Sequence, residues 1–425
     1  MTHAGRFFEM RVAFLTPEYP SELPDAGGLA TYVHRMAQSL QRLGHEVEVF
    51  VTSEQDSSTI SYDGVPVHRV GGSPQSRFVR IGLDASRRLV HLHAWNASIE
   101  LLLQARALAK ALERRHRSTP FDFVQSADYF ATGLFVARRP DRTHAVRCSY
   151  AQDLYNAVDK VHSRSQDFRG YLERLTMRRA DVCYSPSSFL ADYFHRVHAI
   201  DIAVVRPPAH MTAADVTVPQ LALPNRFFIH FGMLIGRKGT DLLAEALPLA
   251  WETAPDLTMV WAGRYLADSR LRGYQSLWGE RAGQIVITGP LPRSDLYGVL
   301  QKSDVAVLPS QVDNLPNTVI ESLSFGIPVL GSRGASIDEL VEDGVTGHLV
   351  DIGDVKGLAQ VLAKMWNRQT PVAKGFKWTS EIRNEMNSER AVENLLRLCT
   401  VKPINGNERN ARTSERMISP PGPAA

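Results

Sequence analysis

The first fifty residues combine two hydrophobic patterns, short apolar runs and apolar residues at helical spacing. The apolar run at 12–15 is typical of a buried parallel strand, and a Pro- and Gly-rich loop follows it over 17–28. Apolar residues then recur every three or four positions over 33–43, Gly44 stands where a helix C-cap glycine belongs, and valines alternate over 47–51. Because such crossovers are right-handed, this segment predicts a βαβ unit in a parallel sheet.

Strand and helix signals continue to alternate in two series, which a proline-rich stretch divides. In the first series, strands are predicted at 121–124 and 181–184. Four prolines and little periodicity mark 206–224, which predicts an inter-domain linker. The second series begins with a strand at 227–231 and a helix at 241–251. Its further strands are predicted at 258–262, 285–287, 304–308 and 329–330.

Two doubly wound parallel sheets, each in its own α/β domain, are therefore the predicted architecture. We place the first domain at 10–207, the linker at 208–224 and the second domain at 225–375. A last helix is predicted within 376–400 and is expected to complete the first domain. The apolar-poor tail at 402–425 is expected to be disordered. The crevice between the two domains is the expected ligand site.

Composition narrows the possible partners and the compartment. The 425 residues include 48 Lys and Arg against 45 Asp and Glu, and a net charge of +3 produces no whole-protein field for nucleic acid. Cys148, Cys183 and Cys399 form neither a zinc-knuckle spacing nor a disulfide framework, which predicts reduced thiols. No apolar stretch approaches the roughly 20 residues that span a bilayer, so we expect a cytoplasmic protein.

Several phosphate-binding and metal-binding signatures are absent from the sequence. It contains no Gly-x-Gly-x-x-Gly triple, no Walker phosphate loop and no Asp-x-Asp pair. The close histidine pairs, His91/His93 and His195/His198, have no third ligand nearby in the sequence. These absences weaken the dehydrogenase, P-loop kinase and metal-hydrolase hypotheses, and we expect neither a metal nor another cofactor.

The most informative segment covers 303–350, where a predicted strand leads into a loop and a short helix. Asn317 or Thr318 begins this helix, whose free backbone N–H groups and partial positive charge suit an anion such as a diphosphate. Glu321 lies one turn into the helix, where its carboxylate can accept hydrogen bonds from ribose hydroxyls. Asp313 lies in the loop and can reach a sugar hydroxyl. Taken alone, the two acids are also explained as residues that the helix dipole favours.

This segment resembles the signature of the family 4 glycosyltransferases, which are retaining enzymes with the two-domain GT-B fold. That signature has two glutamates eight residues apart, then a Gly-x-Pro-Val turn and a Gly-x-Thr-Gly turn. Here these positions hold Asp313, Glu321, 326–329 and 344–347. The aspartate keeps the charge of the family's first glutamate and shortens its reach by one methylene. The resemblance covers most of the chain, from about residue 10 to about residue 398.

Two further segments extend the resemblance. Lys238 matches the family lysine that, together with an arginine, neutralises the donor diphosphate as it leaves, but the arginine position holds Met233. Arg237 could supply that charge from next to Lys238. Because two cations on a leaving diphosphate contribute several kcal/mol, the departure predicts a slower enzyme or a protein without transferase activity. Gly27 and Gly28 resemble the family's glycine pair, where bare backbone approaches donor phosphate or acceptor; the alternative is a flexible turn.

The acceptor side of the site is less well marked in the sequence. The family's histidine near the reacting sugar has no counterpart, because Ser149 and Tyr150 stand at the end of the corresponding strand. Asp128 and Tyr129, which follow the strand at 121–124, are weaker acceptor-site candidates.

A basic surface is predicted over 64–117, which carries ten Lys and Arg against three acids, with leucines interleaved. In the family, enzymes with lipid-linked acceptors often dock on anionic membranes through such a surface, where each basic residue contributes about 1 kcal/mol. The alternative is a helix with one core face and one cationic solvent face.

The resemblance implies transfer of a hexose or related sugar from a nucleotide-diphosphate donor to a glycan or lipid-linked acceptor, with retention and without a metal. The implied setting is polysaccharide or glycolipid assembly in the cytoplasm, at the inner face of the cell membrane. The alternatives are a non-catalytic protein that binds a nucleotide sugar or a partner subunit, and a nucleotide-sugar epimerase. Residues implied in donor binding are Gly27, Gly28, Arg237, Lys238, Asn317, Thr318 and Glu321, and those implied in catalysis are Lys238, Asp313 and Glu321.

Overall fold

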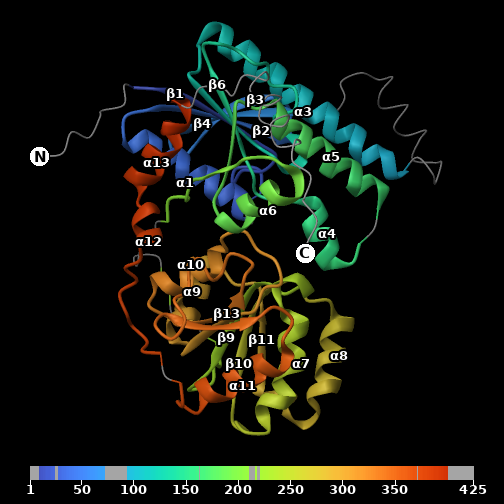
Figure 1. Cartoon of the computed structure of the whole chain (residues 1–425), viewed down its shortest axis with the longest axis vertical. Coiled ribbons are helices and arrows are strands. Elements are labelled where there is room, and N and C mark those ends of the chain that lie inside the picture. Colours follow the sequence, from blue (N-terminus) through green and yellow to red (C-terminus); the bar gives the residue numbers. More distant parts are fainter. Residues whose placement is uncertain are drawn as a thin grey trace, which may run out of the picture.

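The computed structural model describes residues 9–23, 27–71, 93–161, 163–209, 216–217, 221–370 and 372–400. Within them the chain forms two parallel-sheet α/β domains, one above the other in Figure 1. The first sheet ends with β8 (Ala203–Val204) and the second begins with β9 (Phe228–Met233), on either side of the proline-rich stretch. The predicted two-sheet α/β architecture is confirmed. The predicted disordered tail at 402–425 lies outside the described residues.

The first sheet has eight strands in the order β3-β4-β2-β1-β5-β6-β7-β8. Its pairings are parallel except for the hairpin of β3 and β4, whose turn residues Asp63 and Gly64 both have positive φ, 48° and 80°. The sequence analysis did not predict β3, because this edge strand is mostly exposed and lacks the apolar run of a buried strand. The strands are β1 (Arg11–Thr16), β2 (Glu46–Ser53), β3 (Ser58–Tyr62), β4 (Val65–Gly71), β5 (Phe123–Ala127), β6 (Thr143–Arg147), β7 (Val182–Ser185) and β8.

Helices cover the first sheet and place its loops. Apolar residues of α1 at three- and four-residue spacing, including Val33, Met36 and Leu40, are fully buried against β1 and β2. Leu108 and Leu112 of α3 pack in a separate cluster with Leu15 and Phe50 of the sheet. The helices are α1 (Gly28–Arg42), α3 (His93–Ser118), η1 (Tyr129–Ala131), α4 (Gln152–Asp159), α5 (Arg164–Arg179) and α6 (Ser188–His198).

The chain returns to the first domain at its C-terminal end. Helix α13 (Ser388–Arg397) lies beside α1 in Figure 1, and η5 (Leu398–Thr400) follows it. Helix α12 (Glu381–Glu385) precedes α13 and packs Ile382 against a core cluster of the second domain. Leu395 and Leu396 of α13 are fully buried in the same cluster as Met36 and Leu40 of α1. The last helix therefore forms part of the first domain's core, although more than 150 residues of the second domain precede it.

The second sheet has six strands in the order β11-β10-β9-β12-β13-β14, with all pairings parallel. Helices pack on both of its faces, around Trp251 and Trp261 on one side and Val319 and Ile320 on the other. Its strands are β9, β10 (Met259–Arg264), β11 (Ile285–Gly289), β12 (Val305–Leu308), β13 (Val329–Arg333) and β14 (Gly347–Asp351). Its helices are η3 (Gly236–Lys238), α7 (Thr240–Trp251), α8 (Asp268–Trp278), η4 (Gly279–Gln284), α9 (Arg293–Lys302), α10 (Asn317–Ser324) and α11 (Val355–Trp366).

The two sheets face each other through the loops at the carboxyl ends of their strands. Asn314 follows β12, and its amide bonds the backbone of Cys148 and Ser149, which follow β6. Arg237 follows β9 and pairs with Asp159 of α4. This is the edge of a parallel sheet where ligand sites form. Among the described residues, no helix combines the length and the apolarity needed to cross a bilayer.

Candidate active site

Lys238 and Asp313, predicted as site residues from separate segments, lie together. Lys238 ends η3 after β9, and Asp313 lies in the loop after the neighbouring strand β12. Lys238 Nζ donates to Asp313 Oδ2 at 2.5 Å. Ser310 Oγ donates to the same oxygen at 3.2 Å, and the Asn314 N–H donates to Oδ1 at 3.0 Å. Asp313 is buried and accepts these three hydrogen bonds, so its carboxylate is held in one orientation.

Gly239 allows this close approach. Its φ is +80°, and a Cβ built there would lie 2.0 Å from the carbonyl oxygen of Pro309 at the end of β12. Only glycine fits this position without a shift of the backbone. The Lys-Gly pair of the sequence therefore has a geometric cause, since the glycine lets η3 pack against the loop that carries Asp313.

The N-terminus of α10 adjoins both domains. Its N-cap residue is Pro316, which makes no side-chain cap to the first turn at Asn317 and Thr318. A Cβ at Gly232 would lie 3.1 Å from Thr318 Cγ2, and one at Gly28 would lie 3.3 Å from Asn317 Nδ2. Gly28 of the first domain thus faces the helix terminus that was predicted to hold a diphosphate.

Glu321 is enclosed by groups from both domains. Burial raises the pKa of its carboxyl, against the opposing attraction of Arg293 and Arg35. Tyr297 donates from its hydroxyl to Glu321 Oε1 at 3.2 Å. Arg35 lies on α1 of the first domain, and Arg293 and Tyr297 lie on α9. The sequence analysis did not find these three partners, because no spacing rule connects residues 35 and 297 to residue 321.

Arg237 points toward the first domain. Its guanidinium pairs with Asp159 of α4 at 2.8 Å and lies 5.9 Å from the ring centroid of Tyr155. Lys238, by contrast, turns to Asp313. In this arrangement Arg237 bridges the two domains, and its guanidinium does not lie beside Lys238, where it would replace the family arginine that is Met233 here.

Arg264 lies beside Met233 in the sheet. The two residues are register partners at the ends of the parallel strands β9 and β10. Neighbouring strands are about 4.8 Å apart, and register partners project to the same face. Met233 is 38% exposed and Arg264 is half-buried. A guanidinium therefore projects from the strand next to the one that lacks the family's arginine, a juxtaposition that only strand order could reveal.

The carboxylate of Asp128 is surrounded by backbone N–H groups. It is fully buried at the N-cap of η1 and accepts from the N–H groups of Tyr129 at 2.7 Å, Ser149 at 2.9 Å and Tyr150 at 3.2 Å. Burial raises its pKa to about 6, although these bonds and Arg147 act in the opposite direction. Asp128 therefore ties the end of β5 to the loop after β6, and its place in an acceptor site stays a prediction.

Aromatic rings occupy the loops around Asp128. Tyr129, which is half-buried, lies edge-on to Tyr150 with ring centroids 5.8 Å apart. The ring centroid of Tyr150 in turn lies 4.0 Å from that of Tyr155. The Tyr155 ring lies 5.9 Å from the guanidinium of Arg237 in the second domain, and Tyr129 stays an acceptor-site candidate.

Asn314, missed by the sequence analysis, joins the two domains next to Asp313. Its Nδ2 donates to the carbonyls of Cys148 at 3.2 Å and Ser149 at 3.1 Å, and its Oδ1 accepts from Ser187 Oγ at 2.6 Å. The neighbouring residue Leu315 takes a left-handed φ of 53°, which directs this loop across the interface. One asparagine thus fixes the Asp313 loop against β6 and β7.

Metal ligation has no candidate in the described part of the chain, where no group of three or more His, Cys, Asp or Glu side chains is arranged to hold an ion. Independence from metals stays a prediction.

Comparison with known proteins gives the family. Residues 225–368 match the family model described as Glycosyl transferases group 1, and residues 27–209 match the model described as Glycosyl transferase 4-like domain. Similar curated proteins include the D-inositol 3-phosphate glycosyltransferases of Arthrobacter sp. (strain FB24) and Mycobacterium sp. (strain JLS), both 26% identical to this chain. The alignments cover 84% and 81% of this chain, and 87% and 79% of those proteins.

Solved structures agree with this assignment at the level of the fold. Sucrose-phosphate synthase from Thermosynechococcus elongatus matches with a TM-score of 0.67 at 17% identity. Anabaena Alr3699/HepE, in complex with UDP and glucose, matches with a TM-score of 0.60 at 16% identity. Each match covers 96% of this chain and 100% of the other. With its two domains matched by two glycosyltransferase family models and the two-domain GT-B fold observed, this chain is a glycosyltransferase of the GT4/GT-B type.

Proposed function

We propose that the protein transfers a sugar from a nucleotide-diphosphate donor to a glycan or lipid-linked acceptor, with retention at the anomeric carbon and without a metal. The observation that carries the proposal is the Lys238–Asp313 pair beside the N-terminal turn of α10. A cation, a carboxylate and backbone N–H donors thus meet at the carboxyl ends of adjacent strands. A nucleotide-diphosphate sugar offers a complementary group to each of them.

In the proposed reaction, the bond between the anomeric carbon and the diphosphate oxygen breaks, and negative charge develops on that oxygen. Lys238 and the N–H groups near Asn317 and Thr318 stabilise the developing charge, which accelerates the step because the charge is larger in the transition state than in the donor. The acceptor oxygen forms the new bond on the same face, and its proton passes to the leaving diphosphate. Asp313 is free to bind a donor-sugar hydroxyl, because no side-chain base is needed.

Glu321 and Tyr297 are proposed to bind the ribose. The carboxylate accepts hydrogen bonds, and the neighbouring hydroxyl both donates and accepts, so together they suit a vicinal diol. Gly27 and Gly28 are proposed to let the first domain's backbone approach the diphosphate from the other side.

Arg264 is proposed to supply the second diphosphate cation in place of the family arginine at position 233. The support is the register between Met233 and Arg264 in the neighbouring strands β9 and β10. A guanidinium can contact two phosphate oxygens at once, so one residue can replace the missing charge.

A phosphate-bearing acceptor is the second candidate on the acceptor side. The printed names of the curated relatives refer to D-inositol 3-phosphate. In this chain, the charges of Arg169 and Arg237 act on Tyr129 together with the opposing charges of Glu18 and Glu173, and Arg169 lies 5.3 Å from the ring centroid of Phe130. The two arginines are proposed to bind the phosphate of such an acceptor.

Docking on an anionic membrane is proposed for the exposed face of α3. Arg106, Lys110, Arg114 and Arg117 are exposed and recur at spacings of four, four and three residues, which places them on one side of the helix. The segment 72–92 of the predicted basic surface lies outside the described residues. Salt-sensitive cosedimentation with anionic vesicles tests this proposal, and binding that ignores both salt and lipid charge would contradict it.

Thermal unfolding with UDP, GDP and ADP tests donor binding first. A nucleotide at 100 times its dissociation constant stabilises the protein by about 2.7 kcal/mol, and Lys238→Ala should reduce that shift. NMR of the anomeric proton in the first product then distinguishes retention from inversion. If none of the three nucleotides shifts the unfolding temperature, the donor assignment fails and the non-catalytic alternative replaces it.

A further inference from the structure

A cavity of about 670 Å³ lies in the first domain and contains none of the proposed donor-site residues. Its walls come from β2, the β3–β4 hairpin and the C-terminal half of α3. Eight of its twelve lining residues carry charged, imidazole or hydroxyl side chains, namely three arginines, one histidine, three hydroxyl residues and one glutamate, and the other four are apolar.

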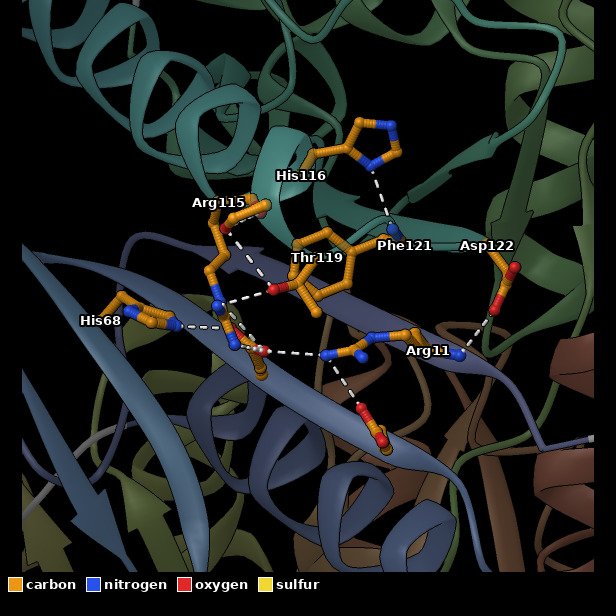
Figure 2. Close-up of polar contacts among 10 residues, drawn as sticks. Arg11, His68, Arg115, His116, Thr119, Phe121 and Asp122 are labelled. Atoms are coloured by element: carbon orange, nitrogen blue, oxygen red, sulfur yellow. Dashed lines mark hydrogen bonds and ion pairs between the residues drawn. The ribbon is translucent and has the colours of Figure 1, made fainter.

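The one carboxylate of the lining, Glu48, is already neutralised. Arg115 donates to both of its oxygens, with Nη2 at 2.8 Å from Oε1 and Nε at 2.9 Å from Oε2. His68 Nε2 lies 2.6 Å from Oε2, and Arg11 Nη2 lies 3.6 Å from Oε1. Arg11, His68 and Arg115, which are labelled in Figure 2, thus reach this carboxylate from β1, β4 and α3.

The protonation state of Glu48 agrees with this geometry. Burial alone would raise its pKa, but the hydrogen bonds of His68 and Arg115 outweigh burial and lower the pKa to about 2. Glu48 is therefore ionised at neutral pH, and its negative charge is compensated by the side chains that it contacts. It does not repel an anion in the cavity as a bare carboxylate would.

The remaining charge of the lining is positive. Arg69 pairs with Glu22 at 2.7 Å, and Arg114 is exposed at the rim, where it has no ion pair among the residues that the structure describes. Ser57, Ser58 and Thr59 add hydroxyls from the opposite wall. Guanidinium groups and hydroxyls around one cavity are the donors that bind phosphate oxygens.

The histidine joins the two walls. Thr59 and His68 are register partners across the β3–β4 hairpin, and Thr59 Oγ1 lies 3.0 Å from His68 Nδ1. His68 Nε2 bonds Glu48, so the imidazole is held by partners on both nitrogens. Its ring also stacks on Phe50 with centroids 4.5 Å apart. The wall that faces the ligand space is thus fixed before any ligand arrives.

We infer that this cavity binds a phosphate-bearing anion, with Arg114 and the hydroxyls of Ser58 and Thr59 as its contacts. The site uses side chains other than those of the donor site, because its lining includes none of the residues proposed to bind the donor. The anion can come from a soluble phosphate ester or from a phospholipid headgroup, and both present the same chemistry.

A local NMR signal tests the inference in the full-length protein. The Cε1–H resonance of His68, assigned by its loss in His68→Gln, is followed while inorganic phosphate is added at constant ionic strength. Arg114→Gln removes the cation at the rim, and Arg117→Gln is the matched control because it removes an exposed arginine of α3 that does not line the cavity. Phosphate at the donor site does not interfere, since the reporter lies in the cavity.

We expect phosphate to shift the His68 signal saturably. Arg114→Gln should raise the dissociation constant of phosphate by about fivefold or more, as expected for loss of one partly exposed charge-assisted hydrogen bond. Arg117→Gln should leave this dissociation constant unchanged. A signal that phosphate does not move, or an equal loss in both variants, would overturn the inference. Cosedimentation with phosphatidylglycerol vesicles separates the sources: a larger deficit in Arg114→Gln than in Arg117→Gln indicates a lipid headgroup in the cavity, and an equal deficit, as docking of the α3 face alone predicts, indicates a soluble phosphate.

Discussion

Replacing Lys238 by methionine separates the structural role of this lysine from its proposed catalytic role. Methionine keeps most of the side-chain volume and removes the charge that pairs with Asp313 at 2.5 Å. Removal of one preorganised donor from a developing oxyanion costs about 10²–10³ in kcat. We therefore expect Lys238→Met to lower kcat by about 100-fold or more, provided that the protein stays folded.

The stability cost of the same change follows from the burial of the pair. Breaking a fully buried ion pair costs about 3–5 kcal/mol, but the Lys238 side chain is 22% exposed. Asp313 also keeps its bonds from Ser310 Oγ and the Asn314 N–H. We therefore expect a loss of about 1–2 kcal/mol, which lowers the unfolding temperature by about 2–8 °C for a domain of this size.

The double variant Lys238→Met/Asp313→Asn completes the test. It removes both charges, so it should regain most of the lost stability while kcat stays low. Donor consumption over a panel of UDP-, GDP- and ADP-linked sugars measures activity, thermal unfolding measures stability, and Lys364→Met on the exposed face of α11 is the surface control. Activity of Lys238→Met within tenfold of wild type, or recovery of activity together with stability in the double variant, would refute the diphosphate assignment.

Four further predictions concern other parts of the molecule. Arg264→Gln should weaken binding of a nucleoside diphosphate but not of the nucleoside, and the added substitution Met233→Arg should restore diphosphate binding. Isothermal calorimetry measures both affinities, and an unchanged diphosphate affinity in Arg264→Gln would show that Arg264 is not the second cation. Glu321→Ala should lower kcat/KM at least tenfold, because it removes the carboxylate that is proposed to bind the ribose hydroxyls. Steady-state kinetics measures this effect, and near-normal turnover would contradict the ribose-binding role. Because burial raises the pKa of Asp128 to about 6 from 3.8, the folded protein holds this proton more tightly than the unfolded chain does. Stability should therefore fall as pH rises from about 4 to about 6, by on the order of 2–3 kcal/mol from this group, and urea titrations should show a flatter profile for Asp128→Asn. Leu395→Ala should destabilise the first domain by about 2–5 kcal/mol, because it leaves a cavity in the core beneath α1; a loss below 1 kcal/mol in denaturant unfolding would show that α13 is not integral to that core.

The domain contacts place several of these effects in one interface. Glu339 of the second domain accepts from the backbone N–H groups of Ser188 and Phe189 at the start of α6, and it pairs with Arg206 at 2.7 Å. Asn314 makes its own bonds to the loops after β6 and β7. The loop that carries Asp313 is therefore positioned by the first domain as well as by its own sheet, so substitutions at this interface should affect the candidate active site without touching it.

Local sequence determined the elements and the segment that carries the chemistry. The apolar runs at 12–15 and 227–231 formed strands because a buried parallel strand is apolar on both faces. The apolar residues at helical spacing over 33–43 lie mostly in α1, because a helix that packs on a sheet buries one side. The Lys-Gly pair at 238–239 and the acids at 313 and 321 were found because their spacing matches a family signature. Each of these features depends on neighbours a few residues away, which a sequence displays directly.

Tertiary structure alone decided which distant side chains meet. Sheet order brought Arg264 beside Met233, and domain packing brought Arg35 toward Glu321 and turned Arg237 to Asp159. The same packing buried Asp128 against three backbone N–H groups and assembled the cavity around Glu48, whose walls are tens of residues apart in the chain. Sequence patterns report the period of burial along one element. They do not report which element packs next to it, and the pairing of charges depends on that packing.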